Sequence, residues 1–252
     1  MKKFLIPFLL LSMLAPAQES ASPDTKVEDG ETPKYLTELR ALSEGDKEKY
    51  LGHLQQSQTL FNQRRIFECL AEIHEAHLIY DKNPVTLNIQ GSCYVEFRDF
   101  EKASRCFKKS LAQDPRNLNV RFNIAEVAFV MKKYGEAKEL FSSLAKKLSD
   151  SANHDSVRDI IQFKILLCHI KTDEEAKAKA MLEKSDFLDD SPFFYYGKAA
   201  IAHSEDNAKE ANQWVQRAAR IFQPTEIQIW QDSLIEVGYV KSFIGEDEED
   251  TE

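Results

Sequence analysis

The sequence predicts an all-α protein built as a solenoid, in which pairs of antiparallel helices stack one upon the next. Three observations lead to this fold class. Apolar and small residues recur at helical spacing through residues 84–117, the same pattern returns at 118–148 and 192–224, and a further apolar helical segment follows at 225–244. A helix pair of this length cannot bury its apolar face alone, so neighbouring pairs are expected to stack.

The clearest pair lies at residues 84–117. Leu87, Tyr94 and Phe107 are bulky residues on the inner faces of the two helices. Gly91 and Ala103 are small, which allows the helices to approach closely, and Pro115 ends the second helix. The corresponding positions of the later copies hold Ala125, Ala137 and Phe141 at 118–148, and Ala211 and Pro224 at 192–224. Weaker copies are predicted at 50–80 and 157–183. The segment 225–244 is expected to cap the last pair, and residues 35–42 the first.

This set of positions resembles the tetratricopeptide repeat (TPR) family. The match is imperfect, because Ser110 stands where the family usually has alanine and Gln90 where it usually has leucine. The resemblance implies a right-handed α-solenoid of about five repeats over residues 35–244, with a C-terminal capping helix. It also implies a scaffold that binds a protein or peptide, with no enzymatic activity and no cofactor.

In TPR proteins the first helices of the pairs line a concave groove. The resemblance places the following residues in that groove: Asn88, Ser92, Val95, Asn119, Phe122, Glu126, Phe129, Tyr196 and His203. Asparagine amides can bind a peptide backbone and aromatic rings can fill pockets. The alternative for Phe122 and Phe129 is burial against a neighbouring helix. Asn88 and Ser92 occupy positions where chaperone-binding members carry Lys or Arg, so capture of an acidic C-terminal tail in the groove is not expected.

The N-terminus predicts export. Lys2 and Lys3 precede an apolar run at residues 4–14, and Ala15-Pro16-Ala17 forms a cleavage site of the A-x-A kind. The run is too short to span a bilayer, so residues 1–17 are expected to be a removed signal peptide, with no stable membrane insertion afterwards. The mature chain is expected in the periplasm or, alternatively, secreted. Residues 18–34 read as a disordered leader and residues 245–252 as an acidic, solvated tail.

Composition narrows the function classes. The chain has 33 basic and 42 acidic residues and a formal net charge of −9. Nucleic acid binding relies on clustered Lys and Arg, so the acidic balance argues against it. The eight glycines form no phosphate-binding loop. These features favour a protein-binding chain over an enzyme.

Three alternatives stay open. The four cysteines, Cys69, Cys93, Cys106 and Cys168, lack metal-binding spacing and are predicted core residues, although export would permit disulfides whose pairing the spacing does not fix. His74 and His77 could bind a metal weakly. The chain could also associate with itself through Tyr195, Tyr196 and Trp230, so a homo-oligomer is a further expectation.

Overall fold

The computed structural model describes residues 32–148, 155–185 and 191–241. The predicted signal peptide, most of the leader and the acidic tail lie outside these ranges. All regular elements of the described residues are α-helices. The chain divides into two compact units, Met1–Val127 and Ala128–Glu252.

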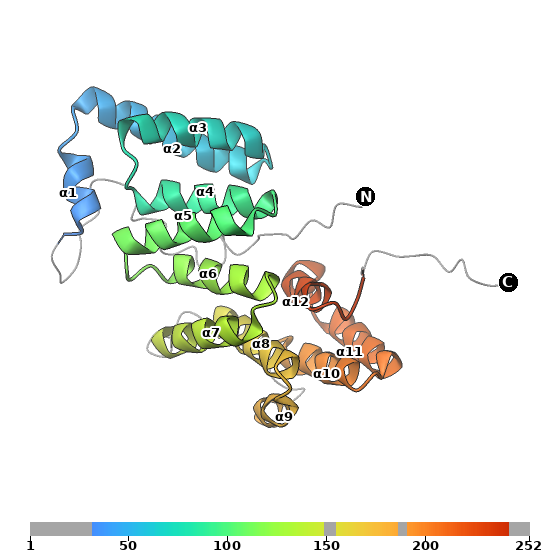
Figure 1. The fold of residues 1–252 in the computed structure, drawn as a ribbon. Coiled ribbons are helices and arrows are strands. Elements are labelled where there is room, and N and C mark those ends of the chain that lie inside the picture. Colours follow the sequence, from blue (N-terminus) through green and yellow to red (C-terminus); the bar gives the residue numbers. More distant parts are fainter. Residues whose placement is uncertain (1–31, 149–154, 186–190, 242–252) are drawn as a thin grey trace. The chain divides into compact units, whose positions relative to one another are not determined.

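The first unit contains a short helix and two helix pairs (Figure 1). Its elements are α1 (Lys34–Arg40), α2 (Glu44–Asn62) with α3 (Ile66–Ile79), and α4 (Pro84–Glu96) with α5 (Phe100–Gln113), followed by α6 (Leu118–Val130), which crosses into the second unit. The helices of each pair run antiparallel and pack along their length, and α3 packs on α4. Tyr35, Leu36 and Leu39 of α1 enter the core of the first pair, as expected of a capping segment.

The second unit continues with α7 (Tyr134–Leu148), α8 (Asp155–Lys171), α9 (Glu175–Leu182), α10 (Phe193–Ser204), α11 (Ala208–Ile221) and α12 (Pro224–Glu236). Helix α8 packs against α7, α9 and α10, and α10 pairs with α11. Helix α12 contacts α8, α10 and α11. The predicted C-terminal capping helix is therefore present and covers the last pair.

The turns inside the helix pairs share one backbone geometry. The second residue after the first helix of a pair has a positive φ near 60° in five turns: Arg64, Arg98, Lys132, Asp173 and Asp206. In the turn after α4, Arg98 N–H donates to Val95 O at 2.8 Å and Asp99 N–H donates to Tyr94 O at 2.9 Å. These two bonds define the Schellman motif, and the other four turns repeat them. Arg64, Arg98 and Lys132 recur at intervals of about 34 residues, the length of one repeat.

Polar side chains fix the helix starts. Asn83 caps α4 through Val85 N–H at 2.9 Å, and Asp99 caps α5 through Lys102 N–H at 3.1 Å. Asn207 caps α11 in the same way through Glu210 N–H. Each cap satisfies an amide that the helix itself leaves without an acceptor. Together with the repeated turns, these caps explain why the pairs form at regular spacing.

Two predicted boundaries were wrong. Helix α2, which opens the first pair, begins at Glu44 rather than near residue 50, because Ser43 caps it through Asp46 N–H at 3.2 Å. The capping helix ends at Glu236 rather than at residue 244, because Gly238 has a φ of 80° and turns the chain away. Both signals, a serine three residues before an aspartate and an isolated glycine, are visible in the sequence.

Candidate functional site

The predicted groove residues lie on α4, α6 and α10, the first helices of their pairs, as the resemblance implies. In the first unit they are used for internal packing. Asn88, Ser92 and Val95 are buried. Asn123 Nδ2 donates to Asn88 Oδ1 at 2.9 Å, and Ser92 Oγ donates to Asn88 O at 3.1 Å. The Asn88 amide oxygen is therefore occupied by the chain itself, which argues against its use for a peptide backbone.

The aromatic residues of α6 are also inside. Phe122 and Phe129 are each 1% exposed, and Glu126, which lies between them in the sequence, is also buried. The Phe129 ring packs edge-on against Tyr134 at 5.6 Å and Phe141 at 6.3 Å between centroids. Of the two readings that the sequence left open for Phe122 and Phe129, burial is the one observed. Neither ring is available to a partner without a rearrangement.

In the second unit the chain covers its own predicted groove positions. Tyr196 is completely buried, with its ring 5.9 Å from Trp230 of α12 and 6.3 Å from Phe163. The His203 ring stacks on Tyr239 at 5.2 Å, three residues beyond the end of α12. Burial lowers the pKa of His203. Helix α12 and the residues after it therefore occupy the surface that the sequence assigned to a partner.

A buried ion pair fastens α12 to α8. Lys164 Nζ lies 2.7 Å from Glu236 Oε2, and the two side chains are only 1% and 8% exposed. The same ammonium lies 4.3 Å from the centre of the Phe129 ring. Burial, followed by the charge of Glu236, raises the pKa of Asp232 to about 7. Two carboxyl groups one turn apart thus share a single lysine.

Asn119 is one of the predicted groove residues with unused hydrogen-bonding capacity, and His203 is another through its Nε2 atom. Asn119 is partly buried at the start of α6, and its Oδ1 accepts no hydrogen bond from the residues that the structure describes. A buried amide oxygen in this state has lost its water without gaining a donor. An incoming N–H group would satisfy it.

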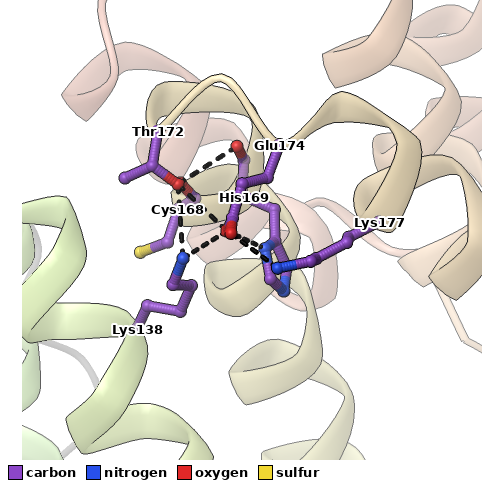
Figure 2. A network of polar contacts seen from close by, with 6 residues as sticks. All are labelled: Lys138, Cys168, His169, Thr172, Glu174 and Lys177. Atoms are coloured by element: carbon purple, nitrogen blue, oxygen red, sulfur yellow. Dashed lines mark hydrogen bonds and ion pairs between the residues drawn. The ribbon is translucent and has the colours of Figure 1, made fainter.

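A second polar cluster surrounds Glu174 at the turn between α8 and α9 (Figure 2). His169 Nδ1 lies 2.7 Å from one carboxylate oxygen and Lys177 Nζ donates to the other at 2.6 Å. Lys138 of α7 donates to Glu174 as well, and Thr172 Oγ1 bonds to Cys168 O. Lys138, then Lys177 and His169, hold the pKa of Glu174 far below its ordinary value. A carboxylate with this many donors ties α7 to the α8–α9 turn and is poorly suited to act as a base.

The last helix pair presents an aromatic surface that the sequence reasoning missed. We call it the Trp214 surface; it consists of Phe194, Trp214 and Phe222, with Lys198 and Arg217 at its edge. Trp214 lies edge-on to Phe194 at 5.7 Å, and the Arg217 guanidinium lies 4.3 Å above the Trp214 ring. A shallow hollow on α11 is lined by Asn207, Lys209, Glu210, Gln213, Trp214 and Arg217. All three aromatic residues are partly exposed.

The residues proposed for self-association are not on that surface. Tyr195, Tyr196 and Trp230 are buried within the chain, so they cannot form an exposed face between two copies. Tyr195 instead supports the Trp214 surface from below, 6.4 Å from Trp214 and 5.9 Å from Phe222. The sequence signal for the surface was the pair of aromatic residues in α11 and just after it.

Among the described residues, no set of side chains supports the metal site suggested for His74 and His77. In residues 32–148, 155–185 and 191–241, no group of three or more potential metal-binding side chains comes together. Burial lowers the pKa of His77. Within the same ranges, no helix is long and apolar enough to cross a membrane.

The repeat spacing and the shared turns agree with a comparison to known families. Residues 94–158 match the family model of the tetratricopeptide repeat. These residues carry the tetratricopeptide repeat pattern. The match covers α5, α6 and α7, and the same turn geometry extends the repeats on both sides of it.

Solved TPR-protein structures resemble this one in fold. The structure described as the functional characterization of Pseudomonas aeruginosa pilF aligns with a TM-score of 0.55 at 17% identity, over 78% of this chain and 90% of that one. YrrB, described as a TPR protein with an unusual peptide-binding site, aligns with a TM-score of 0.52 at 14% identity, over 79% and 96%. A MamA structure (AMB-1) aligns with a TM-score of 0.50 at 13% identity, over 69% and 99%. No curated protein matches this chain at a significant level.

Proposed function

We propose that this TPR protein is an exported scaffold that binds a protein or peptide partner in cell-envelope assembly or secretion. TPR repeats generally serve protein–protein interaction, and YrrB is described as having a peptide-binding site. The signal-like residues 1–17 support export to the periplasm, with secretion as the alternative. No catalytic role is part of the proposal.

The Trp214 surface is the observation that carries this function. Trp, Tyr and Arg are the residues that most often dominate binding energy at protein interfaces. Here a tryptophan and an arginine are stacked and partly exposed on one helix.

Charge defines the kind of partner. Lys198 lies 5.7 Å from the centre of the Phe194 ring, and Lys209 and Arg217 line the hollow beside Trp214 with one carboxylate, Glu210, which leaves a local excess of positive charge on a chain whose net charge is −9. Such a local reversal of sign favours an acidic segment and speeds its association. The proposed partner is therefore a peptide segment with an apolar anchor flanked by Asp or Glu.

The test is affinity capture by the mature chain, residues 18–252, from the envelope fraction of its own organism. Trp214→Ala and Arg217→Glu are expected to lose the partner that the unchanged chain retains. Phe67→Ala is the matched control, because Phe67 is an 80% exposed aromatic residue on α3 of the other unit. Helical circular dichroism should be unchanged in all three variants.

The results separate the explanations. Retention by the control and loss from both Trp214-surface variants would support the proposal. Equal retention by every variant would contradict the proposed surface, and a blank from folded protein would count against binding of an envelope protein. Sedimentation of the same samples tests self-association.

The groove positions that the resemblance assigns are a second candidate site, favoured by the unsatisfied Asn119 Oδ1. Asn119→Ala removes this acceptor without deleting a large apolar group. We expect it to weaken capture if a partner's backbone enters the groove. Phe122→Ala is unsuitable for this purpose, since a side chain 1% exposed would be lost from the core.

A further inference from the structure

Two cysteines meet where consecutive helix pairs pack. Cys69 belongs to α3, the second helix of its pair, and Cys93 belongs to α4, the first helix of the next. Cys93 Sγ lies 3.4 Å from Cys69 Sγ, donating to it as a thiol, and Cys69 Sγ lies 3.2 Å from Ser57 O. Both side chains are completely buried.

We propose that Cys69 and Cys93 are a disulfide-forming pair that covalently joins two consecutive repeats in the exported protein. A disulfide holds its sulfurs about 2.0 Å apart, so the two thiols need only a small approach from their present separation. The inference rests on the proposed export for its oxidising compartment, since disulfides are rare in the cytosol. The pairing itself rests on the geometry.

The remaining cysteines have other neighbours. Cys106 Sγ lies 3.3 Å from Gln90 Oε1. Cys168 belongs to α8 of the second unit and is buried there. Spacing along the chain could not choose among the four cysteines, but the packing of α3 on α4 selects one pair.

The bond forms by thiol–disulfide exchange with a disulfide-bearing oxidant, either a small molecule or an oxidase. The Cys69 thiolate attacks one sulfur of the oxidant, forms a mixed disulfide and releases the oxidant's other sulfur as a thiolate. The Cys93 thiolate then attacks Cys69 Sγ and releases the second. The two cysteines lose two electrons and two protons in total, and the oxidant becomes two thiols. The hydrogen bond from Cys93 lowers the pKa of Cys69, which suits Cys69 as the first nucleophile.

Burial determines when this reaction can occur. An oxidant cannot reach either sulfur while α3 and α4 are packed together. The pair should therefore oxidise quickly during folding and slowly in the folded protein. Once formed, the bond restricts the unfolded chain and stabilises the fold. In a repeat protein, where each repeat contacts only its neighbours, it holds one such junction permanently.

The experiment uses the full mature chain, refolded with oxidised glutathione, then denatured and alkylated with iodoacetamide. We expect two of the four cysteines to be alkylated and a cross-linked Cys69–Cys93 peptide to appear. Before alkylation, the mass of the chain should be two hydrogens below that of the reduced chain. Alkylation of all four cysteines, or a bridge that contains Cys106 or Cys168, would overturn the pairing.

Variants link the bond to stability. Reduction should lower the melting temperature of the unchanged chain and of Cys168→Ala, and should leave Cys93→Ala unaffected. Cys69→Ala gives the same comparison should Cys93→Ala fail to fold. An equal effect of reductant on all variants would contradict the assignment.

A separate measurement distinguishes this inference from the export proposal. Protein recovered from its own cells under acid quenching should already carry the bridge. A pair that oxidises in vitro but is fully reduced in cells would contradict export and leave the pairing intact.

Discussion

Gly91 of α4 lies directly against the ring of Phe107 of α5, so that a β-carbon at position 91 would come within 2.5 Å of Phe107 Cε1. The ring is completely buried, so a β-carbon at position 91 would force it into the packed core. This contact explains two signature positions at once. Position 91 holds glycine because the Phe107 ring fills the space that a larger side chain would need. Gly197 has the same relation to Leu182, at 2.7 Å.

The Gly91–Phe107 contact predicts opposite effects for two glycines in helices. Gly91→Ala should destabilise the protein by about 1–3 kcal/mol, the usual cost of overpacking. Gly52→Ala, in an open part of α2, should instead stabilise it by about 0.5–1 kcal/mol, because alanine favours the helix. Chemical denaturation of both variants measures the difference. A Gly91→Ala variant as stable as the unchanged chain would contradict the contact.

Removal of the ring is the complementary change. Phe107→Ala should cost about 3–5 kcal/mol, as for other buried phenylalanines. Domains hold only about 5–15 kcal/mol in total, so the melting temperature should fall clearly. In a Phe107→Leu background, Gly91→Ala should cost less than in the unchanged chain, which a double-mutant cycle detects. Additive costs would mean that the two residues are not coupled.

The fold was largely predictable because repeats reinforce one another in sequence. Gly91, Ala103 and Phe107 recur as small and large positions in later copies, and helix spacing fixes the rest. The family match over residues 94–158 confirms the resemblance. Helix ends were harder, since Ser43 and Gly238 decide them locally and neither belongs to the repeat.

The site was less predictable, for a physical reason. A motif position states which helix face a residue occupies, but not what covers that face. Tyr196 and His203 stand on the expected helix, yet Trp230 and Tyr239 of the same chain lie over them. The Trp214 surface escaped notice because its residues come from two helices and the segment after them, and only folding brings them together. Whether a partner binds the groove stays a prediction.

The shared left-handed turns predict a stabilising substitution. Lys132 has a φ of 61°, a conformation that costs an L-residue about 1–2 kcal/mol. Glycine avoids that cost but loses about 0.5–1 kcal/mol of backbone entropy on folding, so Lys132→Gly should stabilise by up to about 1 kcal/mol. Lys108→Gly, inside α5, should destabilise by about 1 kcal/mol. Melting temperatures shifted in the same direction would contradict the turn assignment.

The Lys164–Glu236 pair predicts strong dependence of each partner on the other. Glu236→Gln should cost at most about 3–5 kcal/mol, because it removes the carboxylate paired with the buried lysine and leaves Asp232 as the acidic group near it. Lys164→Met in the same chain should recover much of that loss, since both charges are then gone. Urea denaturation of the two single variants and the double variant tests this. A double variant no better than Glu236→Gln would mean that the lysine contributes through packing on Phe129 instead.

Asp232 predicts that the attachment of α12 depends on pH. Burial and the neighbouring Glu236 raise its pKa to about 7, and Lys164 opposes them only in part. An aspartate in the unfolded chain has a pKa of about 3.9. Because the folded pKa is the higher one, the folded state binds this proton more tightly. Its contribution to stability is fully present below about pH 4 and is lost as pH rises through about 7.

Comparison with Asp232→Asn isolates that contribution, because the histidines titrate in both proteins and cancel in the difference. Asparagine stays neutral at every pH, so the variant should gain stability over the unchanged chain between pH 5 and pH 8. The Glu174 carboxylate does not interfere, since its lowered pKa places its own effect in more acidic solution. Denaturation curves of both proteins at pH 5 and pH 8 give the result. A stability difference that is constant over this range would mean that Asp232 is ionised throughout, and that α12 is held by Lys164 and its aromatic contacts regardless of pH.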